Sequence, residues 1–311
     1  MSIYLAHFGL REAPFGITPD TAYFFACADY QEALNTLLIA VRNGEGFIKI
    51  TGEVGTGKTL LCRRFLSALE RTSPDNASSA SGPQFVTAYI PTPFLSPHNL
   101  LLALADELDL DLPDDVSQHQ LVKELTAALV RISRLGKRVV LCLDEAQAIP
   151  MESLETIRLL TNLETEKTKL LQIVLFGQPE LDQKLKQNSI RQLTQRITFH
   201  FHLGPLRRTD LDTYLSHRLT VAGFSGPRLF SRGSVRSLYL ASGGVPRLVN
   251  ILANKALMLS YGEGAQQVRA RHIRAAQLDT VGAKLRRWPW IIVVMIVAMV
   301  AALLLGWARL R

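Results

Sequence analysis

Short apolar runs rich in β-branched residues alternate with segments of helical periodicity along the first two-thirds of the chain. This alternation is typical of a mostly parallel sheet with helices on both faces. The predicted strands are 47–51, 85–90, 138–143, 171–177 and 197–203. Helices are expected between them at 97–110, 118–135 and 151–163. The pattern therefore predicts an α/β fold with a parallel five-stranded sheet.

The pattern changes after residue 203, where only helical periodicity remains. Glycines separate the helical stretches, and glycine commonly ends a helix. The expected helices are 209–222, 231–241, 245–260 and 270–278. We therefore expect an α/β core at 46–205 followed by a smaller helical domain at 206–280. A polar stretch of small residues at 71–83 is typical of a surface loop within the core.

A long apolar segment follows the predicted helical domain. No charged residue occurs in 288–308, and 291–305 is apolar throughout. The 21 positions of 288–308 would span roughly 31 Å as a helix, about the thickness of a bilayer's hydrocarbon core. Aromatic residues that favour membrane interfaces flank the segment: Trp288, Trp290 and Trp307. We expect a transmembrane helix at 290–308 after a basic linker at 281–289, and a buried core helix is the alternative.

Charge is unevenly distributed along the 311 residues. The net charge is +8 overall, but it is −4 for residues 1–205, +7 for 206–280 and +5 for 281–311. A basic region of this kind can face nucleic acid, an anionic membrane or the phosphates of a nucleotide, and a solvated surface without a partner is as good an explanation. Three scattered cysteines, without metal-ligand spacing, indicate buried thiols in a reducing compartment.

A phosphate-binding motif directly follows the first predicted strand. Its pattern is G-x-x-x-x-G-K-[ST], and a helical stretch comes next. A strand, a glycine-rich turn and a helix N-terminus direct backbone N–H groups at one anion. Lys58 can reach the outer phosphates and the Thr59 hydroxyl can hold Mg²⁺. The predicted nucleotide-binding stretch is Gly52, Glu53, Val54, Gly55, Thr56, Gly57, Lys58, Thr59 and Leu60.

Nucleotide binding also bears on location. Nucleoside triphosphates are cytoplasmic, and the first residues have neither a basic nor a long apolar region of a signal peptide. Three basic residues precede the predicted membrane helix and two follow it. Because basic residues favour the cytoplasmic side of a membrane, this slight excess also favours a cytoplasmic N-terminal side. We therefore expect a single-pass membrane protein whose nucleotide-binding domain is cytoplasmic.

Polar residues follow two further predicted strands. Asp144 and Glu145 come directly after the strand at 138–143, and Gln178 follows the strand at 171–177. Ligands of open α/β sheets bind at the carboxyl ends of the strands. Asp144 would hold Mg²⁺ and Glu145 would act as general base on the attacking water. Gln178 would sense the γ-phosphate, and its alternative role is at the N-terminus of a helix.

Three arginines are further candidates. Arg191 and Arg196 precede the last predicted strand, where either one could project into a neighbouring subunit's site as a trans-acting finger. A surface salt bridge explains them equally well. Arg247 follows Pro246, and a proline in the first turn of a helix fixes where that arginine points.

With these residues assembled, the chain resembles the AAA+ ATPases, and specifically their bacterial ExeA/GspA-like branch, which includes the MshM-like proteins of MSHA pilus biogenesis. The resemblance runs nearly end to end, and the blocks in this order are fairly specific. They are 7–15, 18–20, 30–34, 52–59, 144–147, 162–165, 177–181, 191–196 and 244–250.

The resemblance implies a role for each candidate residue. Lys58 and Thr59 are then Walker A residues, and Asp144 and Glu145 are Walker B residues. Gln178 is sensor 1, Arg196 is the arginine-finger candidate and Arg247 is sensor 2. The helical domain is a lid, and an N-terminal segment at 1–45 helps to enclose the adenine through Phe8, Phe15 and Tyr30.

The resemblance also implies a function. It is hydrolysis of Mg²⁺-bound ATP by a homo-oligomer, with a hexameric ring as one form, in the assembly of a type IV pilus or a type II-like secretion machine at the inner membrane. The C-terminal helix would contact the lipid bilayer. ExeA-type proteins continue with a periplasmic peptidoglycan-binding domain, whereas few residues follow the apolar segment here, so the MshM-like architecture fits better and no cell-wall binding is expected.

Two other functions remain open. The first is a nucleotide-dependent DNA-binding switch related to transposition ATPases, because the helical region has a charge of +7. The expected membrane helix and the lack of a helix-turn-helix or zinc motif make nucleic acid a less favoured partner. The second is a scaffold that binds ATP without hydrolysing it, which Glu145 disfavours.

Overall fold

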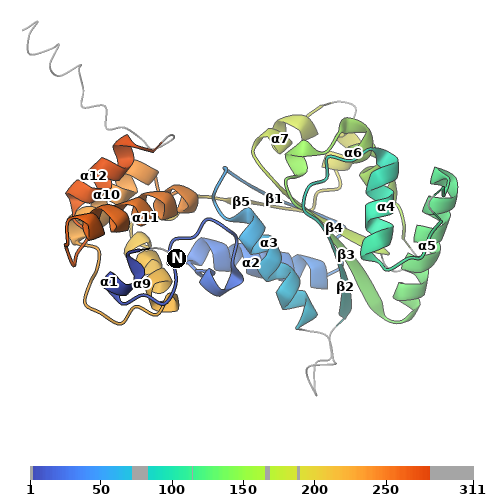
Figure 1. Cartoon of the computed structure of the whole chain (residues 1–311). Helices are drawn as coiled ribbons and strands as arrows, with labels where there is room; N and C mark the ends of the chain where they lie inside the picture. Colours follow the sequence, from blue (N-terminus) through green and yellow to red (C-terminus); the bar gives the residue numbers. More distant parts are fainter. Residues whose placement is uncertain (1–2, 72–82, 114, 165–168, 188–189, 281–311) are drawn as a thin grey trace, which may run out of the picture.

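The computed structural model describes residues 3–71, 83–113, 115–164, 169–187 and 190–280. Figure 1 shows a sheet with its covering helices on one side of the molecule and a bundle of helices on the other. Nearly all of the predicted polar loop at 71–83 lies outside the described residues.

The sheet has five strands, as the sequence pattern predicts. All strand pairs are parallel, and the order is β2-β3-β4-β1-β5. Every residue of β4 is buried, because this strand has a neighbour on each side and helices on both faces. The strands are β1 Phe47–Gly52, β2 Gln84–Ile90, β3 Lys137–Leu143, β4 Leu171–Gly177 and β5 Phe199–Leu203.

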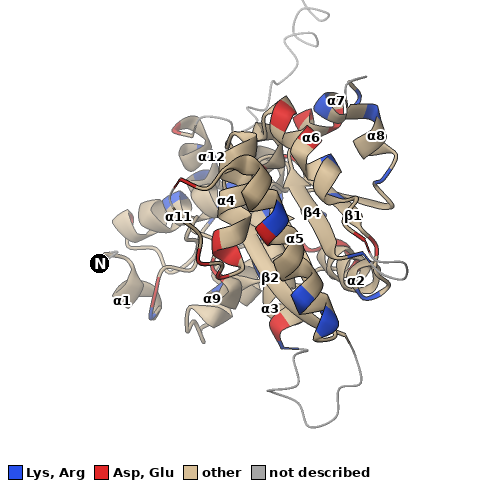
Figure 2. Ribbon diagram, turned by 90° about the vertical axis from the view of Figure 1, so that its right-hand side faces the viewer, with Lys and Arg blue, Asp and Glu red and all other residues tan. Residues whose placement is uncertain are grey.

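Helices cover both faces of the sheet. On one face, α2 (Ala28–Arg42) and α3 (Lys58–Glu70) bury leucine and phenylalanine side chains against Ile48 and Ile50 of β1. Phe47 points to the opposite face, because successive side chains of a strand alternate. The helices on that second face are α4 Pro97–Glu107, α5 Gln118–Arg134 and α6 Met151–Leu160. Charged residues lie on the helices that cover the sheet, whereas β4 has none (Figure 2).

The N-terminal segment packs on the C-terminal helices. Tyr4, just before α1 (Leu5–Phe8), donates a hydrogen bond to Asn254 at 2.5 Å, and the Arg11 N–H donates to the Ala222 carbonyl at 2.9 Å. The helices of this bundle are α9 Leu211–Val221, α10 Arg232–Ser242, α11 Pro246–Gly262 and α12 Ala270–Leu278. The boundaries at 46–205 and 206–280 stay predictions.

The prediction of a fold completed by a C-terminal transmembrane helix is corrected. None of the helices in the described residues is both long and apolar enough to cross a membrane. The helices α5 and α11 have 17 residues each, or about 26 Å, and both carry charged residues. The segments predicted as linker and membrane helix, 281–289 and 290–308, lie outside the described residues.

Candidate functional site

The glycine-rich turn joins β1 to α3 through backbone geometry that glycine favours. Gly55 has a φ of +81° and Gly57 a φ of +93°, both in the left-handed region. A Cβ atom at Gly57 would lie 2.8 Å from the Tyr30 hydroxyl oxygen. A Cβ at Gly55 would lie 2.6 Å from Cβ of Arg247. The turn therefore has its shape because neither position carries a side chain.

Lys58 is the first residue of α3 and is buried. Its ammonium donates hydrogen bonds to the carbonyl oxygens of Gly52 at 2.8 Å and Glu53 at 3.0 Å. Burial lowers the pKa of Lys58, while the nearby carboxylates of Glu145 and Asp144 act in the opposite direction. An ammonium held this way beside a turn of N–H groups can bind phosphate oxygens without leaving the loop.

Asp144 follows β3 and is also buried. Burial raises the pKa of its carboxyl group, and hydrogen bonds from the Thr59 hydroxyl and the Glu145 N–H counter this. The Glu145 N–H lies 2.9 Å from Asp144 Oδ1, and the Tyr89 hydroxyl lies 3.4 Å from Oδ2. A buried carboxylate beside a threonine hydroxyl offers the oxygen ligands that Mg²⁺ takes together with phosphate oxygens. The residues present thus fit this ion.

Glu145 has an unusual backbone conformation. Its φ of +50° is in the left-handed region, which costs a non-glycine residue about 1–2 kcal/mol. The side-chain amide of Gln178 donates to Glu145 Oε2 at 3.1 Å, and that of Gln147 donates to the same oxygen at 2.5 Å. Strain of this kind accumulates at functional sites. Sequence reasoning gave Gln147 no role, although it lies in the same Asp-Glu-Ala-Gln stretch.

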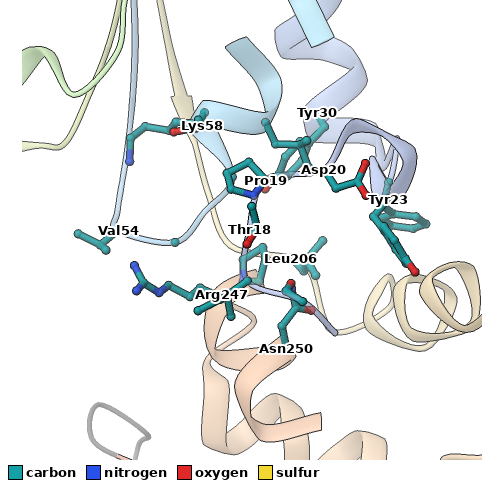
Figure 3. A pocket seen from close by; sticks show the side chains of 18 of the residues that line it. Thr18, Pro19, Asp20, Tyr23, Tyr30, Val54, Lys58, Leu206, Arg247 and Asn250 are labelled. Atoms are coloured by element: carbon teal, nitrogen blue, oxygen red, sulfur yellow. The ribbon is translucent and has the colours of Figure 1, made fainter. Parts of the chain in front are cut away.

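Helix α11 begins beside the phosphate-binding turn. The Arg247 N–H donates to the Gly55 carbonyl oxygen at 3.1 Å, and Pro246 occupies the first turn of the helix, as expected. Figure 3 shows the Arg247 side chain extending along the pocket toward Val54. The bundle of helices and the sheet therefore meet at the pocket.

A network of buried polar side chains holds the N-terminal segment over the pocket. Arg218 donates to the carbonyl oxygen of Pro14 at 2.5 Å and stacks over the Tyr23 ring, 4.5 Å from its centroid. Asn250 donates to the Gly16 carbonyl oxygen at 3.2 Å. Sequence reasoning missed Arg218 and Asn250 as pocket residues, and only the position of Asn250 in the Gly-Val-Pro-Arg-Leu-Val-Asn stretch hints at it.

The aromatic residues expected around the adenine divide into two groups. Tyr30 lines the pocket, as do Tyr23 and Phe25. Phe8 and Phe15 are buried in the core and do not line it, and the Phe15 ring packs instead against Phe230 at 5.7 Å. An enclosing role for Phe8 and Phe15 is therefore indirect.

The two finger candidates lie outside the pocket. Arg196 is partly buried, and its guanidinium donates to the Thr161 hydroxyl of the same chain at 2.8 Å. Arg191 starts α8 (Arg191–Thr194) and is exposed. Its guanidinium forms no hydrogen bond or ion pair with the residues that the structure describes. Of the remaining predicted residues, one pocket brings together Lys58, Thr59, Glu145, Gln178 and Arg247, with Asp144 directly behind Thr59.

Comparison with known proteins adds sequence and fold relationships. Residues 41–185 match the family model described as an AAA domain. The chain is 39% identical over 282 residues to general secretion pathway protein A of Aeromonas hydrophila. That match covers 91% of this chain and 49% of the relative, so the chain spans about half of that protein's length.

Solved structures share the fold at low sequence identity. Cdc6p from Pyrobaculum aerophilum is 16% identical with a TM-score of 0.62, over 85% of this chain and 71% of that one. The ORC1 protein of Aeropyrum pernix, in complex with DNA, is 18% identical with a TM-score of 0.62, over 86% of this chain and 69% of that one. The chain thus has the α/β P-loop fold of AAA proteins.

Replacement of Gly57 by alanine tests the geometry of the turn. The Gly57→Ala variant should lose at least tenfold in affinity for ATP, because alanine is strained at positive φ and its methyl group would meet Tyr30. Gly204→Ala is the matched control, since nothing lies within 4 Å of a Cβ there. Fluorescent-nucleotide titration measures both, and equal affinities would show that the turn does not form the binding site.

Proposed function

We propose, from the premise that this chain carries an AAA domain with an intact phosphate-binding turn, that it binds Mg²⁺-bound ATP and hydrolyses it. One observation carries the proposal. The residues that follow β1, β4 and β3, which are neighbours in the sheet, lie together around one pocket. An anion-binding turn, an Mg²⁺-binding carboxylate and a general base are the parts that phosphoryl transfer to water requires.

Each residue has a defined part in the reaction. The N–H groups of the turn and the ammonium of Lys58 bind the outer phosphates. Glu145 accepts a proton from the attacking water while the water oxygen forms a bond to the γ-phosphorus. The bond between that phosphorus and the bridging oxygen breaks, and ADP is released. Gln178 orients the γ-phosphate. Mg²⁺ held by Thr59 and Asp144 would neutralise charge on the phosphates.

Arginine fingers supplied by a neighbouring copy complete the proposed site. No arginine other than Arg218 and Arg247 lines the pocket in the described residues, and Arg218 is engaged with the N-terminal segment. Arg196 and Arg191 lie outside the pocket, and Arg191 is exposed, so a second copy could receive an arginine from this stretch. We therefore propose a homo-oligomer, with a ring as one form, in which one of these two arginines acts in trans.

The process served by hydrolysis is assembly of a secretion or pilus machine. The identity of 39% to general secretion pathway protein A supports this assignment, with protein components of such a machine as partners. Within it, a role in type IV pilus assembly is the form of the proposal that the resemblance to MshM-like proteins suggests. The contacted proteins and the role in the machine are parts of the proposal.

ATP turnover by the full chain tests the proposed activity. The wild type should hydrolyse ATP at high protein concentration, and Lys58→Ala and Glu145→Gln should each lower kcat at least 100-fold. Lys58→Ala removes a phosphate contact and Glu145→Gln removes the base. Lys123→Ala, at an exposed position of α5, is the control and should match the wild type. Turnover that persists in both site variants would refute the assignment.

Mixed subunits test the finger. Glu145→Gln chains and Arg196→Ala chains should each be nearly inactive alone, and a mixture should regain turnover, because some composite sites combine an intact Glu145 with an intact Arg196. Phosphate release from titrated mixtures is the measurement. A normal rate for Arg196→Ala would exclude this residue and assign the role to Arg191, which is exposed in the structure.

A second candidate function is nucleotide-dependent DNA binding, and an arginine-rich surface favours it. The residues of this surface lie on α10, on α12 and at the residue directly before α12. The N-terminal ends of the two helices touch, with Cβ positions of Gly233 and Ala270 at 3.9 Å. They are all exposed: Arg232, Arg236, Arg269, Arg271 and Arg274. The solved structures that share the fold include ORC proteins bound to DNA.

The arginine-rich surface lies too far from the pocket to serve the bound nucleotide. His272 of α12 meets Glu263 at the C-terminal end of α11, with 3.0 Å between Nε2 and Oε2, whereas the pocket is at the N-terminal end. With 17 residues, α11 separates the two by about 26 Å. The phosphates that these arginines could bind therefore belong to another molecule.

Salt dependence of DNA binding separates the two functions. If the second function holds, the triple variant Arg232→Gln, Arg236→Gln and Arg274→Gln should show a weaker salt dependence of DNA binding. The slope of log affinity against log salt should become less negative by about 3, since each phosphate contact contributes about 0.9. The control replaces Lys123, Arg131 and Arg134 of α5, at the other end of the molecule, by glutamine (Figure 1). Equal slopes, or no binding of 30-base-pair duplex, would exclude DNA binding by this surface.

A further inference from the structure

The side-chain amide of Gln147 forms hydrogen bonds within the site through both its oxygen and its nitrogen. Its Oε1 accepts the Gln178 N–H at 2.9 Å, and its Nε2 donates to Glu145 Oε2 at 2.5 Å. The backbone N–H can only donate, so the oxygen of the amide must face it and the NH₂ group must face Glu145. Gln147 therefore connects the segment after β3 with the end of β4.

Both amides bind one oxygen of the Glu145 carboxylate. Gln147 and Gln178 donate to Oε2. Glu145 Oε1 accepts no hydrogen bond from the residues that the structure describes, so this oxygen is free to receive a proton. Two donors at one oxygen fix the rotation of the carboxylate, which the left-handed backbone of Glu145 already directs toward the pocket.

The turn that carries Gln147 is itself fixed. The ammonium of Lys184, on α7 (Glu180–Leu185), donates to the carbonyl oxygens of Gln147 and Ile149, both at 2.7 Å. The absence of a side chain at Gly177 leaves room for Leu181 of the same helix, because a Cβ there would lie 2.7 Å from Leu181 Cδ2. The backbone of Gln147 is thus held independently of its side chain, and a change of side chain need not move the turn.

We infer that Gln147 is a positioning residue for hydrolysis. It holds the Glu145 carboxylate with Oε1 toward the attacking water, and it ties this base to the backbone of the residue that contacts the γ-phosphate, Gln178. The inference rests on the proposed hydrolysis of ATP. It assigns to Gln147 an effect on the chemical step and none on nucleotide binding, because the amide does not line the pocket.

The isosteric variant Gln147→Glu isolates the donor. A carboxylate at 147 can still accept the Gln178 N–H, but it presents an oxygen instead of NH₂ to Glu145, and two carboxylates at this distance cannot both ionise freely. We expect kcat to fall about 10- to 100-fold while KM for ATP changes less than twofold. Gln147→Met, which lacks both donor and acceptor, should also lower kcat.

Gln183→Glu is the matched control. It makes the same change of charge at an exposed position of α7, and it should retain wild-type kcat and KM. If Gln147→Glu and Gln183→Glu give the same kcat, the inference is wrong. It is also wrong if Gln147→Glu weakens ATP binding in proportion to its loss of kcat, because a general disturbance of the pocket would do that.

A thermal double-mutant cycle tests the contact without turnover. Gln147→Glu should lower Tm in the otherwise wild-type chain, and by less in a Glu145→Gln chain, because a glutamine at 145 can donate to the new carboxylate. Equal shifts in Tm would overturn the positioning role whatever the turnover. A wild-type chain without Lys58-dependent hydrolysis would instead refute the proposed function, and the cycle would still decide whether Gln147 and Glu145 are coupled.

Discussion

The parallel pairing of β4 with both β1 and β3 is the constraint on which the candidate site depends. In this register Thr51 lies beside Gly177, and Leu143 lies beside Leu175. The three strands therefore end at one edge, and the phosphate-binding turn, Asp144 and Gln178 follow as neighbours there. A shift of one strand by a single residue would turn its side chains to the other face and separate these groups.

The arrangement buries charge, and this has a cost in stability. Burial raises the pKa of Asp144 and lowers that of Lys58, so each charged form is disfavoured in the folded chain. Because the pKa of Asp144 is raised in the folded chain, its protonated form contributes to the free energy of unfolding at low pH. This contribution is lost as the pH rises through the raised pKa. A bound Mg²⁺ and triphosphate would supply the opposite charges that these groups lack.

The sequence predicts those parts of the fold that depend on local pattern. Apolar runs place all five strands within two residues of their observed starts, and the glycine-rich motif identifies Lys58 and Thr59 because the turn is continuous in sequence. The contacts of Arg218 with Pro14 and of Arg196 with Thr161 join residues far apart in the chain, and no local pattern specifies them. The predicted transmembrane helix is corrected because the described helices are short and carry charge.

The central claim is that the groups at this sheet edge bind Mg²⁺-bound ATP. Titration calorimetry of ATP binding with and without Mg²⁺, on the wild-type chain and on Asp144→Asn, tests it most directly. Mg²⁺ should strengthen ATP binding by the wild type and have little effect on Asp144→Asn, whose neutral amide is a poor ligand for a hard cation. An equal effect of Mg²⁺ on both chains, or no ATP binding by the wild type, would contradict it.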